Sequence, residues 1–167
     1  MLTKAQFEEL DDNLSIFLIY MEDAHDEFLE AAAIKGYRLD YTLDNLPELE
    51  RYVLEQGVKF VHETDEEMTH FAHCWYHLAM VLRTNFEGQW AVSNNEENSA
   101  NEGKWVIQDF KSIAEGIEFD PKAIVRRFIK KQKPNAFRAA ILSSTDPNFF
   151  AESHAYLNSL REEEEKG

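Results

Sequence analysis

TDEEMTHFAHCWYHLAMVLRT, residues 64–84, carries the clearest helical pattern in the chain. It begins with a capping box, in which the Thr64 hydroxyl accepts a hydrogen bond from the Glu67 amide and the Glu67 carboxylate reaches back. Apolar residues then recur at spacings of three and four: Met68, Phe71, Trp75, Leu78 and Leu82. The stretch therefore predicts a helix from Thr64 to about Thr84 that packs this stripe against a core.

Four possible metal ligands share another face of this helix, away from the apolar stripe, when residues are placed at intervals of about 100°. They are Glu66, His70, His73 and His77. Two imidazoles four residues apart, such as His73 and His77, can bind one metal ion. This face predicts a candidate site for a divalent transition metal, completed by His25 or His62. The alternative is a solvated face or a subunit interface, because one helix supplies at most two or three ligands and a site usually needs four.

Short β-strands are predicted directly after this helix. Glu87-Gly88 breaks the helix, and residues 89–93 and 104–108 have the composition of strands, with a tryptophan in each. The polar segment 94–103 is predicted to be an exposed hairpin loop. Residues 116–119 are predicted to add a third strand, which would complete a small antiparallel β-meander.

Asp-Pro pairs predict the starts of two further helices, because Asp is a good N-cap and Pro suits the first helical position. Asp120-Pro121 begins a helix that ends before Pro134. Asp146-Pro147 begins a terminal helix, and the acidic tail 162–167 beyond it is predicted to fray. The apolar residues of this terminal helix are Phe150, Leu157 and Leu160.

Two helices are predicted upstream of residue 64. Apolar residues spaced by three and four predict one long helix from about Lys4 to about Ile34. A second helix begins at Thr42 or Asn45 and ends at Gly57, with a proline in its first turn. The apolar run Ile16–Met21 makes the first helix unusually wide on its apolar side, which predicts burial on more than one side or a homodimer.

Together these elements predict a single α+β domain over residues 1–167. Its N-terminal helices pack on a small antiparallel β-meander and are followed by C-terminal helices. The chain length of 167 residues is close to that of one domain, and no linker divides it.

The charge balance is strongly acidic, with 17 Lys and Arg against 32 Asp and Glu and a formal net charge of −15. Such a surface repels nucleic acid and anionic lipid and attracts basic partners. We therefore expect neither a nucleic-acid nor a membrane partner. The one cysteine, Cys74, cannot form an internal disulfide, and the chain opens without a secretory pattern, so a cytoplasmic location is expected.

Basic residues gather at the end of the helix that follows Asp120-Pro121. The candidate interaction residues are Arg126, Arg127, Lys130 and Lys131. They are predicted either to bind an acidic partner or a phosphate, or simply to complement the helix dipole and pair with the acidic first helices.

Several motifs resemble those of small, uncharacterised bacterial proteins with the order helix, helix, G-x-W strand, hairpin and D-P helix. Tyr41–Leu46 opens one helix, 76–83 precedes Asn85–Trp90, and Phe119-Asp120-Pro121 opens the next helix. The resemblance covers about half of the chain. It implies an α+β fold in the bacterial cytosol and brings no catalytic residues.

The sequence contains no complete catalytic pattern. Cys74 lies in mid-helix, Ser143-Ser144 has no nucleophile-elbow context, and no glycine-rich phosphate loop is present. We expect a protein that is not an enzyme, needs no cofactor and acts in protein interaction, as an immunity-like or adaptor protein that binds a basic partner. The alternative is a metal-binding protein that uses the histidine-rich helix face.

Overall fold

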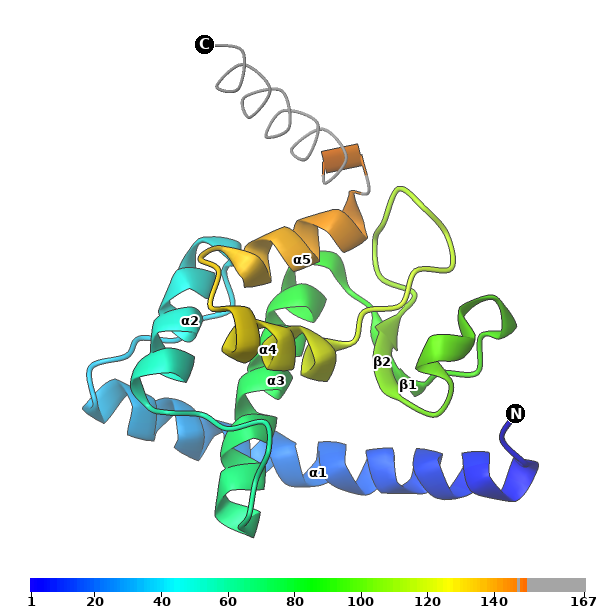
Figure 1. Cartoon of the computed structure of the whole chain (residues 1–167), viewed down its shortest axis with the longest axis horizontal. Coiled ribbons are helices and arrows are strands. Elements are labelled where there is room, and N and C mark those ends of the chain that lie inside the picture. The colour runs from blue at the N-terminus through cyan, green and yellow to red at the C-terminus, as the bar shows by residue number, and fades with distance from the viewer. Residues whose placement is uncertain (147, 150–167) are drawn as a thin grey trace.

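The computed structural model describes residues 1–146 and 148–149, and this part of the chain folds into a group of helices with a two-stranded antiparallel sheet at one side (Figure 1). The α+β fold class is confirmed. In chain order the elements are α1 (Lys4–Ile34), η1 (Leu43–Asn45), α2 (Leu46–Glu55), α3 (Asp65–Phe86), β1 (Gln89–Val92), η2 (Glu96–Asn101), β2 (Trp105–Gln108), α4 (Pro121–Lys131) and α5 (Ala136–Thr145). None of the helices in the described ranges is long and apolar enough to cross a membrane.

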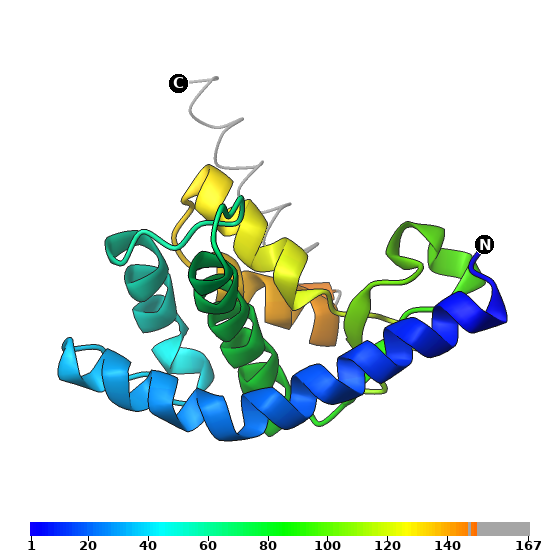
Figure 2. The same ribbon diagram turned by 90° about the horizontal axis from the view of Figure 1, so that it is seen from below.

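Helix α3 is the centre of the fold and contacts α1, α2, α4 and α5 (Figures 1 and 2). The predicted Thr64 cap is present, because the Thr64 hydroxyl accepts from the Glu67 amide at 3.1 Å. The other half of the predicted capping box is replaced, because the Glu67 carboxylate lies 3.1 Å from Lys59 Nζ. Residues 71–79 are all buried, so the helix is enclosed on every side rather than on one stripe. At its exposed first turn Met68, expected in the core, has 44% of its surface accessible.

Helix α1 has the predicted bounds and runs along the base of the molecule (Figure 2). Its start is fixed by Thr3, which accepts from the Gln6 amide while Gln6 caps the Thr3 amide in return. Ile16, Ile19 and Tyr20 remain exposed. The apolar surface on which the homodimer prediction rests is therefore present, and the dimer itself stays a prediction.

The hairpin pairs Trp90 with Ile107 and Val92 with Trp105. The predicted third strand is reduced, within the described residues, to an isolated bridge between Ile107 and Phe119. Gly88 leads into β1 with a φ of +102°, and a Cβ there would lie 2.8 Å from Ile107 Cγ2. Only glycine fits this tight entry from α3 into the sheet.

Helix α4 begins at the predicted Asp120 cap, whose carboxylate accepts from the Ala123 amide. Helix α5 was not predicted, and its first turn is capped from another element. The Glu50 carboxylate of α2 accepts from the Asn135 amide at 2.8 Å and from the Phe137 amide at 3.2 Å. The predicted helix after Asp146-Pro147 and the predicted frayed tail 162–167 lie outside the described residues.

Cys74 lies in the middle of α3 and is completely buried. Burial raises the pKa of its thiol well above the ordinary value, because the thiolate would lose its hydration. The side chain therefore acts as a small apolar core residue, as its mid-helix position predicted.

Candidate functional site

Three imidazoles form a chain between α1 and α3, which we call the histidine cluster: His25, His73 and His77. His25 Nδ1 lies 3.2 Å from His73 Nδ1, and His25 Nε2 lies 3.1 Å from His77 Nδ1. All three are buried, with 3%, 7% and 1% of their surface accessible. His25 thus joins two α3 histidines that are one helical turn apart.

The hydrogen-bond partners fix the proton positions in the neutral cluster. His77 Nε2 lies 2.9 Å from the Asp40 carbonyl oxygen, which can only accept, so His77 carries its proton on Nε2. His77 Nδ1 then accepts from His25 Nε2, and His25 Nδ1 accepts from His73 Nδ1. Neutral rings therefore satisfy every hydrogen bond within the histidine cluster. One ring nitrogen, His73 Nε2, is left without a partner in this assignment.

The surroundings of the histidine cluster disfavour charge. Burial, followed by the neighbouring imidazoles, lowers the pKa of His25 to about 3. Burial likewise lowers the pKa of His73 to about 4 and that of His77 to about 4. The cluster is therefore neutral at pH 7.

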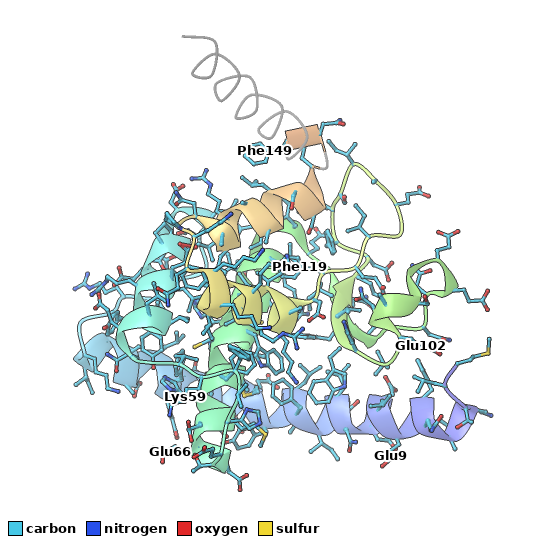
Figure 3. The ribbon with its side chains drawn as sticks, in the orientation of Figure 1. Glu9, Lys59, Glu66, Glu102, Phe119 and Phe149 are labelled. Atoms are coloured by element: carbon cyan, nitrogen blue, oxygen red, sulfur yellow. The ribbon has the colours of Figure 1, made fainter. Side chains whose placement is uncertain are left out.

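The predicted metal face is divided by this packing. Glu66, His70 and His73 line one open hollow of about 640 Å³ beside α2, whereas His77 lies deeper in the core. Glu66 is exposed at the first turn of α3 (Figure 3), and His70 Nε2 lies 2.8 Å from the Tyr52 hydroxyl. His62 is exposed on the loop before α3 and joins none of these groups.

The solvated alternative for this face is wrong for His73 and His77, which are core residues. Among the described residues no group of three or more His, Cys, Asp or Glu side chains is arranged to hold a metal ion. His25 turns a different nitrogen toward each partner, so the three rings do not converge on one point. Metal binding stays a prediction.

A sequence signal for this burial existed. Residues 71–82 contain no charged side chain, and a helix without charge around its whole circumference for three turns is typical of a central helix. A helical-wheel projection hides this signal, because it assigns histidine to the polar face even when the histidine is uncharged and buried.

The predicted interaction residues on α4 are Arg126, Arg127, Lys130 and Lys131, and all four are exposed. Lys130 lies over the Phe60 ring, with its Nζ 5.2 Å from the ring centroid. An interaction role for this set stays a prediction.

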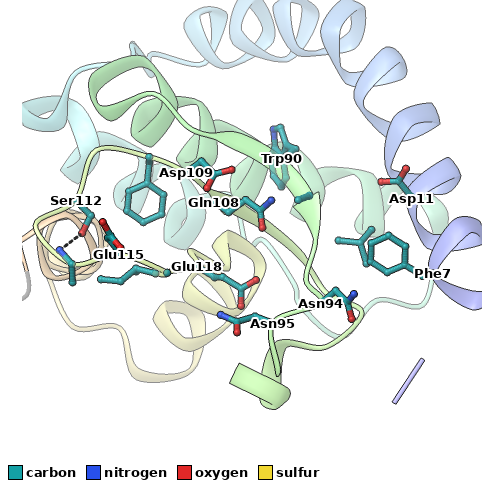
Figure 4. Close-up of a pocket in the computed structure, with 16 residues that line it drawn as sticks. Phe7, Asp11, Trp90, Asn94, Asn95, Gln108, Asp109, Ser112, Glu115 and Glu118 are labelled. Atoms are coloured by element: carbon teal, nitrogen blue, oxygen red, sulfur yellow. Dashed lines mark hydrogen bonds between the residues drawn. The ribbon is translucent and has the colours of Figure 1, made fainter. Parts of the chain in front are cut away.

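A second candidate site, which we call the acidic cleft, has a volume of about 750 Å³ (Figure 4). It lies between the first turns of α1, the hairpin and the loop 109–118. Four carboxylates line it: Asp11, Asp109, Glu115 and Glu118. Three side-chain amides, from Asn94, Asn95 and Gln108, add further oxygen acceptors. No Lys or Arg is present among the described residues that line the cleft.

The loop that carries three of these carboxylates is anchored at several points. The Ser112 hydroxyl donates to the Ser144 carbonyl at 2.8 Å and accepts from the Ala114 amide at 3.4 Å (Figure 4). The Ile113 amide donates to the Thr145 carbonyl at 3.1 Å. The Lys111 amide donates to the Phe86 carbonyl at 2.7 Å. These bonds hold the wall opposite Asp11 in place, so the cleft exists without a ligand.

Sequence reasoning predicted an acidic protein but missed the acidic cleft. Its carboxylates are separated by up to 107 positions in the chain, from Asp11 to Glu118. Asp109, Glu115 and Glu118 share one loop, but no local spacing brings Asp11 to them, and only the packing of α1 beside β1 does so.

Comparison with known proteins gives no match to a protein family, to a curated protein or to a solved structure. The resemblance to small bacterial α+β proteins therefore stays a prediction.

Proposed function

We propose that this protein is a non-enzymatic interaction protein, of immunity or adaptor type, that binds a basic segment of a partner protein in the acidic cleft. The observation that carries the proposal is a hollow of about 750 Å³ lined by four carboxylates and, within the described residues, by no cationic side chain. Carboxylates gathered in a cleft focus a negative potential and attract cations.

The composition of the cleft favours a peptide over a bare ion. Trp90, Phe110 and Ile117 contribute apolar surface between the carboxylates, which suits the methylene stems of lysine and arginine. A volume of this size accommodates several side chains, and pockets for organic ligands fall in the same range. The buried histidine cluster takes no part in this function.

The test measures binding of an arginine-rich peptide to two variants of equal net charge. The cleft variant carries Asp11→Asn, Asp109→Asn, Glu115→Gln and Glu118→Gln. The control variant carries Glu9→Gln, Asp12→Asn, Asp23→Asn and Glu30→Gln, all at exposed positions of α1 that do not line the cleft. Asn at 109 tolerates the φ of +57° found there.

We expect the cleft variant to weaken binding by about tenfold or more, since four charge pairs of about 0.5 kcal/mol each are lost. The control variant should weaken it by less than about threefold, through the long-range field alone. Equal losses in the two variants would show that the peptide senses only the net charge, and the proposal would then be wrong. Circular dichroism and thermal melting check that both variants fold.

A further inference from the structure

A second concave surface lies on the other side of α1, between α1 and α4, and its character is opposite to that of the acidic cleft. It consists of two adjoining hollows of about 420 and 340 Å³. Both are lined by Trp75, Trp105 and Lys122, so they form one continuous surface, which we call the α1–α4 groove.

One half of the α1–α4 groove is apolar. Its walls come from α1 and from the first turns of α3, with Trp75 and Trp105 as the floor. The apolar lining residues are Phe17, Tyr20, Met21, Met68, Phe71 and Ala72. Phe17 stacks on Trp75 at a centroid distance of 4.9 Å and lies 5.1 Å from Trp105, so the floor is a packed aromatic layer. Tyr20 and Met68 stay largely exposed at the rim.

The other half is cationic. Lys104, Lys122 and Arg126 line it, and Asp120 is the one carboxylate among its described lining residues. Asp120 is already engaged, because it caps the Ala123 amide and lies 3.8 Å from Lys104 Nζ. An excess of positive charge at one end of a groove is unusual in a chain with 32 acidic and 17 basic residues.

We propose that the α1–α4 groove binds a small anionic amphiphile, a molecule with one carboxylate or phosphate head and an apolar body. The head lies among Lys104, Lys122 and Arg126, where ammonium and guanidinium groups give charge-assisted hydrogen bonds. The body lies along the aromatic floor toward Tyr20 and Met68 and covers their exposed surface. The combined volume is within the range of pockets for small organic ligands. This site is independent of the acidic cleft and of the partner proposed for it.

Charge complementarity excludes a basic or neutral occupant. A lysine-rich segment would meet three cations at the cationic end of the groove, and a neutral apolar molecule would give Lys122 and Arg126 no counter-charge, since Asp120 lies beside Lys104. A nucleic acid would be repelled by the acidic surface that surrounds the groove.

The experiment titrates decanoate, decyl phosphate and decanol into the full chain and follows tryptophan fluorescence, to which Trp75 and Trp105 contribute. We expect both anions to bind at least tenfold more tightly than decanol, and acetate to bind too weakly to detect. Comparison of decanoate with decyl phosphate then assigns the head group. Equal affinity for decanoate and decanol, or no binding of either anion, would overturn the proposal.

Two pairs of variants locate the site. Lys122→Gln with Arg126→Gln should remove the preference for the anion, whereas Lys130→Gln with Lys131→Gln removes the same charge from the same helix and should keep it. Met68→Glu places a carboxylate at the apolar rim and should weaken decanoate binding about tenfold. Val61→Glu makes the same change at an exposed position outside the groove and should have little effect. Equal effects within either pair would contradict the assignment.

Discussion

The histidine cluster and the acidic cleft are both groups of titratable side chains, yet the packing gives them opposite surroundings. The imidazoles of His25, His73 and His77 are buried, neutral and bonded to one another. The four carboxylates of the acidic cleft line an open hollow in contact with water. Residue type alone does not separate a core residue from a binding residue, since His and Asp both serve as ligands elsewhere. The difference lies in what surrounds each group.

The largest effect is expected from removal of the central imidazole. His25→Ala deletes the ring that bonds both His73 and His77, which leaves two buried imidazoles short of a partner and opens a cavity. We expect the free energy of unfolding to fall by about 4 kcal/mol, as measured by urea denaturation at pH 7.5. His62→Ala, at an exposed position, should change it by less than about 0.5 kcal/mol. A loss below about 1 kcal/mol for His25→Ala would mean that the cluster does not hold α1 to α3.

A somewhat smaller effect is expected from acid. The folded pKa values, about 3 for His25 and about 4 for His73 and His77, lie below the ordinary value of 6.5. The unfolded chain therefore binds more protons than the folded protein at acid pH. The contribution of the three histidines to the free energy of unfolding is fully present above pH 6.5 and is lost as the pH falls toward 4. We expect the free energy of unfolding, measured by urea denaturation, to be about 3 kcal/mol lower at pH 5 than at pH 7.5. This is less than the sum of three independent histidine contributions, because partial hydration reduces each of them.

The groups around the cluster do not reverse this direction. Tyr41, Tyr52 and Tyr76 pack against its histidines or neighbour His70, and burial raises the pKa of each hydroxyl, so they stay neutral in this range. Glu50, whose pKa is raised by burial, offsets a small part of the loss. A flat profile between pH 7.5 and 5 would show that the imidazoles are not held neutral.

The smallest effect is expected from added metal. In the neutral cluster His73 Nε2 is the one nitrogen left unshared by the assigned hydrogen bonds, so a zinc or nickel ion would have to break the bonds of His25 to gain a second ligand from within the cluster. We expect thermal melting of tag-free protein to shift by less than about 1 °C with either ion. A saturable rise in melting temperature that disappears in His73→Phe would instead support the metal-binding alternative predicted from the helix face.

Much of the fold could be predicted because its signals are local. The bounds of α1, the Thr64 cap of α3 and the Asp120 cap of α4 each depend on residues within four positions of one another. The cap of α5 could not be predicted, since Glu50 reaches Asn135 across 85 positions. Propensity rules contain no term for such a contact.

The candidate sites divide in the same way. Spacing alone placed His73 and His77 on one helix face, and His25 was named as a possible partner, but the neutral hydrogen-bonded chain depends on where α1 crosses α3. The acidic cleft has no local signal, because Asp11 meets the loop that carries Asp109 only through tertiary packing. For the histidine cluster, the residues could be predicted from the sequence. For the acidic cleft, only the negative net charge of the protein could be predicted.

The reactivity of the buried Cys74 thiol can report how often the helices around α3 separate. The chain has one thiol, and it lies at the centre of α3 with none of its surface accessible. A thiol reagent can therefore reach it only when the helices around α3 separate, and the rate of labelling counts these events directly. A substitution that loosens the packing of α1, α2, α4 or α5 on α3 should shorten the labelling time, whereas a change confined to the acidic cleft should leave it unaltered.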